Sequence, residues 1–143
     1  MIKPISEQEL IRLARHAQNQ AISNDDLDQV ASFWTQDVTV RRALGQAVEG
    51  REAARKVMEF SGDPARRIVY QRATVTVEVS RNWLLAYEEG QWSGHLGSAN
   101  GPIVIGGRYA AQWVKRDGRW LIRSELFVAL DCDGIGCDFV AMA

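Results

Sequence analysis

The chain has 143 residues, of which 46% are hydrophobic, and its 17 basic and 18 acidic residues leave a net charge of −1. This length suits one domain with a hydrophobic core, so we predict a single domain over residues 1–143. The balanced charge gives no electrostatic reason for the protein to bind nucleic acid or an anionic membrane.

No segment approaches the roughly 20 apolar residues of a membrane span. Charged residues also interrupt the N-terminus where a signal peptide would be apolar, so we expect a cytoplasmic protein. The pairs Arg41-Arg42 and Arg66-Arg67 are short, which favours solvated surface over a phosphate site.

Helical patterns fill the first third of the chain. Ser6 and Glu9 form a capping box, which favours a helix start by satisfying free backbone N–H groups. Apolar residues then recur at three- and four-residue spacing and predict one buried face: Leu10, Leu13, Ala14, Ala17 and Ala21. A second helix is expected after Asp25, and a third over residues 52–60.

Strand patterns dominate the rest. Short strands are predicted over residues 35–40 and 45–50, and four longer ones with a hydrophobic period of two over 69–79, 83–94, 103–115 and 120–130. Asp117-Gly118 favours a type I′ hairpin turn, because both residues accept positive φ. The order ααββαββββ predicts an α+β fold, in which a cone-like, curved, mixed or antiparallel sheet wraps around three helices and encloses a pocket.

Three segments add a family signal: DLDQVASFWTQDV at 26–38, AYEEGQW at 86–92 and GRYAAQWVKRDGRWLIRSELF at 107–127. With this order of elements, the chain resembles the nuclear-transport-factor-2-like superfamily, in its SnoaL-like and ketosteroid-isomerase-like branch, over roughly residues 6–130. The resemblance implies a cone-like α+β barrel with a deep apolar pocket, commonly paired through the outer sheet face. It implies no single reaction, since the superfamily includes isomerases, dehydratases, cyclases, hydrolases and non-catalytic binders.

The steroid-isomerase mechanism can be compared with this chain position by position. Ketosteroid isomerases place an aspartate base just after the first strand, where this chain has Arg42. Their oxyanion-hole tyrosine aligns near Gln18, and their protonated aspartate aligns near Ala110 or Ala111. The resemblance therefore implies that this protein does not isomerise steroids by that mechanism.

Glu88 and Glu125 are the first catalytic candidates, because each is predicted in mid-strand among apolar neighbours. A carboxylate that faces an apolar cavity is desolvated, and its raised pKa suits general acid–base catalysis. The alternative is a surface ion pair with an arginine such as Arg108 or Arg123. His95 is a third candidate because imidazole titrates near neutrality, although strand alternation places it opposite Glu88 and favours a solvent-exposed ring.

Aromatic side chains are abundant for a domain of this size. Trp113 and Trp120 are expected in the core or at a subunit interface. Core packing is also the alternative for the other aromatic residues. We predict that six side chains bind the substrate: Trp34, Val40, Met58, Trp92, Tyr109 and Phe127.

Cys132 and Cys137 lie in DCDGIGC, which offers neither a histidine nor a second cysteine pair to complete a zinc site. We expect reduced thiols rather than a disulfide or metal ligands. The sequence contains no P-loop, metal triad or nucleophile elbow, so we predict no cofactor and no metal.

The leading functional hypothesis is a cofactor-free enzyme that acts on a small hydrophobic, cyclic molecule by acid–base chemistry, through isomerisation, dehydration or aldol-type cyclisation. One alternative is a non-catalytic module that binds an apolar ligand or partner, and another is a dimer whose own aromatics fill the cavity. Apolar residues on both faces of the predicted strands, such as Tyr87 opposite Trp92, also predict a homodimer.

Overall fold

The computed structural model of the chain describes residues 3–138, and its helices and strands follow the predicted order. No helix in this part of the chain is long and apolar enough to cross a membrane. The third helix ends four residues earlier than predicted. The elements are α1 (Glu7–Ser23), α2 (Leu27–Ala31), β1 (Trp34–Arg41), β2 (Val48–Glu49), α3 (Arg51–Lys56), η1 (Pro64–Arg66), β3 (Ile68–Val79), β4 (Leu85–Leu96), β5 (Ile103–Arg116), β6 (Arg119–Cys132) and η2 (Gly134–Asp138).

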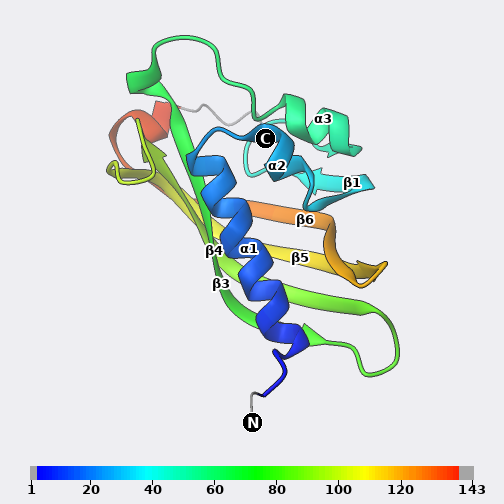
Figure 1. The fold of residues 1–143 in the computed structure, drawn as a ribbon. Coiled ribbons are helices and arrows are strands. Elements are labelled where there is room, and N and C mark those ends of the chain that lie inside the picture. Colours follow the sequence, from blue (N-terminus) through cyan, green and yellow to red (C-terminus); the bar gives the residue numbers. More distant parts are fainter. Residues whose placement is uncertain (1–2, 139–143) are drawn as a thin grey trace.

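The six strands form one mixed sheet in the order β2-β1-β6-β5-β4-β3. β1 runs parallel to β6, and all other neighbours are antiparallel. Asp117 and Gly118 join β5 to β6 with φ values of 53° and 76°, as the predicted type I′ turn requires. The sheet curves without closing into a barrel, and the three helices pack on one face of it, with α1 crossing the long strands (Figure 1). The predicted α+β class is confirmed.

The buried face of helix α1 overlaps the predicted one only in part, since Ala21 is buried and Ala14 and Ala17 pack against the core as predicted. Leu10 and Leu13 were expected in the core but are 36% and 48% exposed. Arg15 of α1 turns toward the sheet because it pairs there with the carboxylates of Glu88 and Glu125. The spacing of apolar residues alone therefore predicts the wrong rotation of the helix about its axis. The buried positions of α1 are Ile11, Arg15, Gln18, Ala21 and Ile22.

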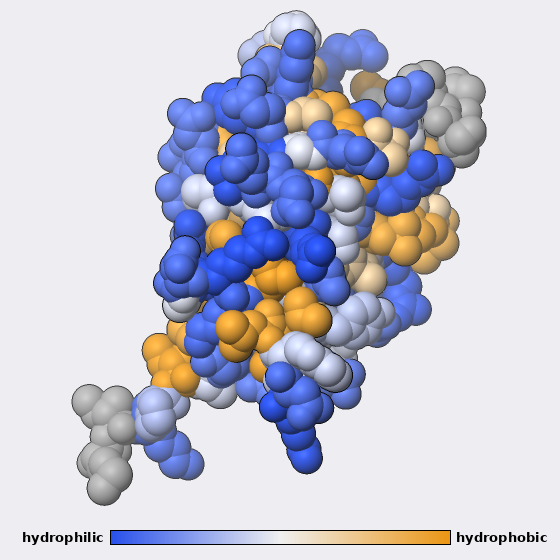
Figure 2. Space-filling view, turned by 90° about the vertical axis from the view of Figure 1, so that its right-hand side faces the viewer, coloured by the Kyte–Doolittle hydropathy of each residue, from blue (hydrophilic) through white to orange (hydrophobic). Residues whose placement is uncertain are grey.

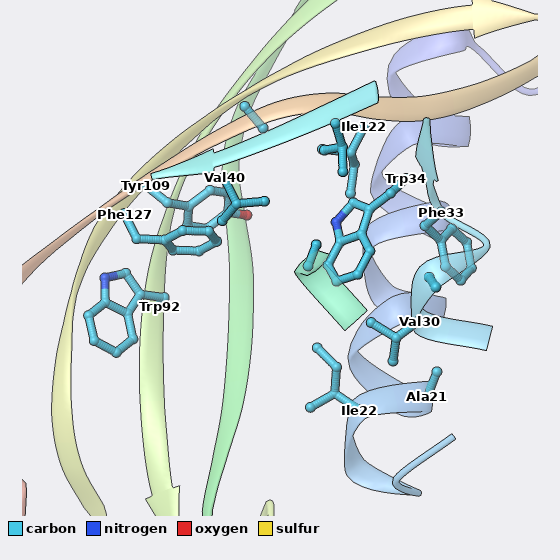
Figure 3. Close-up of a cluster of buried hydrophobic side chains, with 14 of the residues drawn as sticks. Ala21, Ile22, Val30, Phe33, Trp34, Val40, Trp92, Tyr109, Ile122 and Phe127 are labelled. Atoms are coloured by element: carbon cyan, nitrogen blue, oxygen red, sulfur yellow. The ribbon is translucent and has the colours of Figure 1, made fainter. Parts of the chain in front are cut away.

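The hydrophobic core joins the helices to the sheet. Trp113 and Trp120 are both buried in it, as predicted. In Figure 3 the core residues form two groups, with Trp92, Tyr109, Phe127 and Val40 on one side and Ile22, Val30, Phe33, Trp34 and Ile122 on the other. On the face shown in Figure 2, hydrophobic side chains (orange) appear as patches between polar and charged residues (blue).

Cys132 and Cys137 form a disulfide, so the prediction of reduced thiols is wrong. β6 ends at Cys132, and η2 then turns the chain back from Gly134, which has a φ of 54°. This reversal brings the two Cα atoms to 5.1 Å across a sequence separation of five. The cysteine spacing alone did not indicate the turn.

Candidate functional site

A cavity of about 360 Å³ lies between the helices and the sheet, and this volume is within the range of small-molecule sites. Figure 3 shows Trp92 and Phe127 on one side of this space and Trp34 and Ile22 on the other. Six of the nine predicted site residues line the cavity, namely Trp34, Val40, Met58, Trp92, Glu125 and Phe127.

Glu125 is among the residues that line this cavity, and its side chain is fully buried, with 0% exposed. The indole Nε1 of Trp34 donates a hydrogen bond to Oε1 of Glu125 at 2.9 Å, and Nη1 of Arg15 donates to Oε2 at 3.0 Å. An ionised carboxylate offers about four lone-pair sites. These two hydrogen bonds therefore fix the carboxylate and leave lone pairs on its oxygens for a further hydrogen bond.

Glu88 does not line the cavity, and five donors saturate its fully buried carboxylate. Nε and Nη2 of Arg15 donate to it, as do the hydroxyls of Thr74 and Tyr109 and the indole of Trp113. Burial by itself raises the pKa of Glu88, but Arg15 and these hydrogen bonds outweigh burial and hold the pKa below its ordinary value. The prediction that Glu88 has a raised pKa is therefore wrong. The alternative, an ion pair on the sheet surface, is also wrong because the ion pair is buried.

Arg15 connects the two carboxylates, and sequence reasoning missed it. Burial lowers the pKa of Arg15, but Glu88 and Glu125 outweigh burial and raise the pKa above its ordinary value, so the guanidinium is charged. Its central carbon lies 5.1 Å from the centroid of the Tyr109 ring and 5.2 Å from that of Trp113. The sequence carried no local signal for this role, because the partners of Arg15 lie 73 and 110 positions away in the chain.

Two further candidates lie outside the cavity lining. Tyr109 sits behind Phe127, with 5.6 Å between the ring centroids, and its hydroxyl is directed to Glu88. The ring nitrogens of His95 lie 2.9 Å from the hydroxyl of Ser93 and 2.9 Å from the carbonyl of Gly101. The structure therefore does not bring His95 together with Glu125.

Among residues 3–138, the arginines that line the cavity are Arg42, Arg66, Arg67 and Arg72, and the acids that line it are Glu59 and Glu125. Arg41 and Arg66 are exposed, as expected for solvated surface, whereas Arg42 and Arg67 are half-buried. Arg42, which aligns with the steroid-isomerase base, is thus in the site as a cation. The cavity is apolar on its aromatic sides and rich in positive charge elsewhere.

Residues 4–124 match the family model of the SnoaL-like domain. The chain belongs to the SnoaL-like domain family. This finding confirms the resemblance inferred from the sequence motifs. None of the curated proteins compared with the chain matches it.

Solved structures share the fold of this SnoaL-like chain at low sequence identity. A protein from Novosphingobium aromaticivorans, provisionally assigned as a scytalone dehydratase, has a TM-score of 0.68 and 16% identity over 87% of this chain and 84% of its own. A provisionally assigned calcium/calmodulin dependent protein kinase II association domain from Xanthomonas campestris has a TM-score of 0.67 and 17% identity over 90% and 98%. An NTF2-like protein from Cytophaga hutchinsonii has a TM-score of 0.66 and 13% identity over 87% and 99%. These likenesses show the fold alone.

Within residues 3–138 of the SnoaL-like chain, no group of three or more His, Cys, Asp or Glu side chains could hold a metal ion. The chemistry that the arrangement offers is that of a fixed carboxylate, several guanidinium groups and aromatic walls. Such a site can exchange a proton with a bound molecule and orient its oxygen atoms.

Proposed function

We propose that this protein is a cofactor-free enzyme that moves a proton on a small hydrophobic, cyclic molecule, with Glu125 as the general acid or base. The proposal is supported by Glu125, which is among the residues that line the cavity and whose buried carboxylate is held by Trp34 and Arg15. Isomerisation, dehydration and aldol-type cyclisation all require such a group. A positioned acid or base contributes a rate factor of about 10²–10⁴.

Glu88 supports this role from outside the cavity. It accepts hydrogen bonds from two nitrogens of Arg15, which leaves Nη1 of Arg15 directed to Glu125. Glu88 is thus a positioning residue, and Arg15 transmits its effect. Preorganised contacts of this kind cost no rearrangement during the reaction.

The alternative is a non-catalytic module that binds an apolar ligand. It is favoured by the hydrogen bonds that both oxygens of Glu125 already accept from Arg15 and Trp34, since these contacts hold the fold together without any reaction. One structural neighbour has a dehydratase assignment and another an association-domain assignment, so the neighbours favour neither hypothesis.

Proton exchange on a bound ketone tests the proposal. We expect the protein to accelerate exchange of the α-protons of 2-tetralone in deuterated buffer, followed by NMR, and Glu125→Gln to abolish the acceleration. Binding of the ketone is first established from the fluorescence of Trp34 and Trp92, which line the cavity. A bound ketone that exchanges no faster than in buffer would favour the binding module.

A further inference from the structure

The guanidinium of Arg72, on β3, is buried at the cavity without a partner. Its Nε and Nη1 atoms are closed to water and have no hydrogen-bond partner among residues 3–138. No carboxylate in this part of the chain forms an ion pair with it. Its central carbon lies 5.1 Å from the centroid of the Phe127 ring. Arg72 thus holds a largely buried positive charge that forms no ion pair within residues 3–138. Burial lowers the pKa of Arg72, and the charge of Glu125 opposes this effect only in part.

The two acidic residues that line the cavity form ion pairs with other arginines and not with Arg72. Among the acids of the cavity, Glu125 pairs with Arg15, and Glu59 pairs with Arg55 on α3 at 3.1 Å. Neither carboxylate forms an ion pair with Arg72, although the charge of Glu125 acts on it from a distance. Burial of an unpaired charge is costly, and an anion brought by a ligand would offset that cost.

A second arginine adds to the positive charge on the same side of the cavity. Burial raises the pKa of Tyr70, whereas Arg42 and Arg72 both lower it, which places both guanidinium groups near this phenol. All three residues line the cavity. The positive charge is thus concentrated beside Tyr70.

We infer that Arg72 forms an anion subsite and that the ligand of this cavity is a hydrophobic carboxylate, with its ring among the aromatic side chains and its oxygens on Arg72. A planar guanidinium matches the two oxygens of a carboxylate, and a charge-assisted pair of this kind is strong when desolvated. Part of the Arg72 side chain remains accessible and borders the cavity, where the ligand would meet it. This inference names the substrate class of the proposed function and rests on the same cavity.

A matched pair of ligands tests the subsite. The probes are 2-naphthoate and 2-naphthylmethanol, which share a ring system and differ in charge, titrated at pH 7 by calorimetry and by tryptophan fluorescence. We expect the acid to bind about tenfold or more tightly than the alcohol. Arg72→Gln should remove this preference and leave the affinity for the alcohol within about threefold. Arg81→Gln, an exposed arginine in the turn between β3 and β4, is the control and should retain the preference.

Equal affinity for the two compounds, a preference that survives Arg72→Gln, or no binding of either compound would overturn the inference. Glu125→Gln separates this result from the proposed function, because it removes the acid or base and leaves Arg72 in place. The subsite predicts that Glu125→Gln binds the acid as tightly as the unchanged protein or more tightly. If Arg72→Gln loses the preference while Glu125→Gln keeps full proton exchange, the subsite stands and the proposed function fails.

Discussion

Arg15 on α1 and Glu88 on β4 form a buried two-point ion pair, although 73 positions separate them in the chain. Nη2 of Arg15 lies 2.8 Å from Oε1 of Glu88, and its Nε lies 3.2 Å from the same oxygen. The remaining nitrogen, Nη1, reaches Glu125 in the cavity wall. The contact that ties the helix to the sheet therefore also orients the candidate catalytic carboxylate.

Arg15→Met is expected to destabilise the protein by about 3–5 kcal/mol, because it leaves two buried carboxylates without a countercharge. The free energy of unfolding from urea denaturation measures this loss. Arg12→Met is the matched control on the same helix, and its cost should stay below about 1 kcal/mol since Arg12 is exposed. Similar losses for the two variants would mean that the buried pair does not stabilise the fold.

Acid should destabilise the protein through Glu88. The pKa of Glu88 is lower in the folded protein than its ordinary value of about 4.3. A lowered folded pKa contributes stability that is present above the unfolded pKa and is lost as the pH falls through the folded pKa. We expect the free energy of unfolding to fall as the pH drops below about 4.3, and Glu88→Gln to reduce this slope. An identical pH dependence in both proteins, measured by urea denaturation from pH 7 to pH 3, would contradict this assignment.

Arg72→Met should leave stability unchanged or increase it by about 1–3 kcal/mol, because methionine keeps apolar contact with Phe127 and removes a buried charge whose Nε and Nη1 atoms have no hydrogen-bond partner within residues 3–138. Thermal and urea unfolding without ligand measure this effect. A loss of more than about 2 kcal/mol would show that Arg72 stabilises the fold through contacts of its own.

The outer face of the sheet should join two copies of the chain. Tyr87, Leu126 and Val128 are each about half exposed there, and Leu126 lies opposite Ala110 in the β5–β6 register. Apolar residues on an uncovered sheet face favour a subunit interface. Light scattering at micromolar concentration should give the mass of a dimer, and Leu126→Glu should shift it to a monomer, while Ile5→Glu, at an exposed position before α1, should not. A monomeric mass for the unchanged protein would contradict this prediction.

The element order could be predicted from sequence because its signals are local. The capping box at Ser6 and the turn at Asp117-Gly118 each act within a few residues, and both occur in the structure. These features depend on neighbours in the chain.

The charged part of the site could not be predicted in the same way. Arg15 is buried because two distant strands supply its partners, and no local pattern reports such pairing. The apolar residues Ala73 and Val75 alternate with Arg72 along the strand, so a simple alternating pattern predicts that Arg72 points away from the core. In the structure Arg72 lines the cavity, and a register shift between Thr74 and Thr76 interrupts the regular alternation of β3. Buried polar contacts and irregularities in strands can therefore be identified only from the three-dimensional structure.

The most direct test of the account compares catalysis with binding in Glu125→Gln, using one ligand for both. For the α-proton exchange of 2-tetralone, we predict a fall in kcat of about 10²–10⁴ while the Kd from tryptophan fluorescence changes by less than about threefold. Glu125→Asp, which keeps the carboxylate, should recover part of the rate. Unchanged exchange in Glu125→Gln, or no exchange by the unchanged protein with the ketone bound, would contradict the role assigned to Glu125.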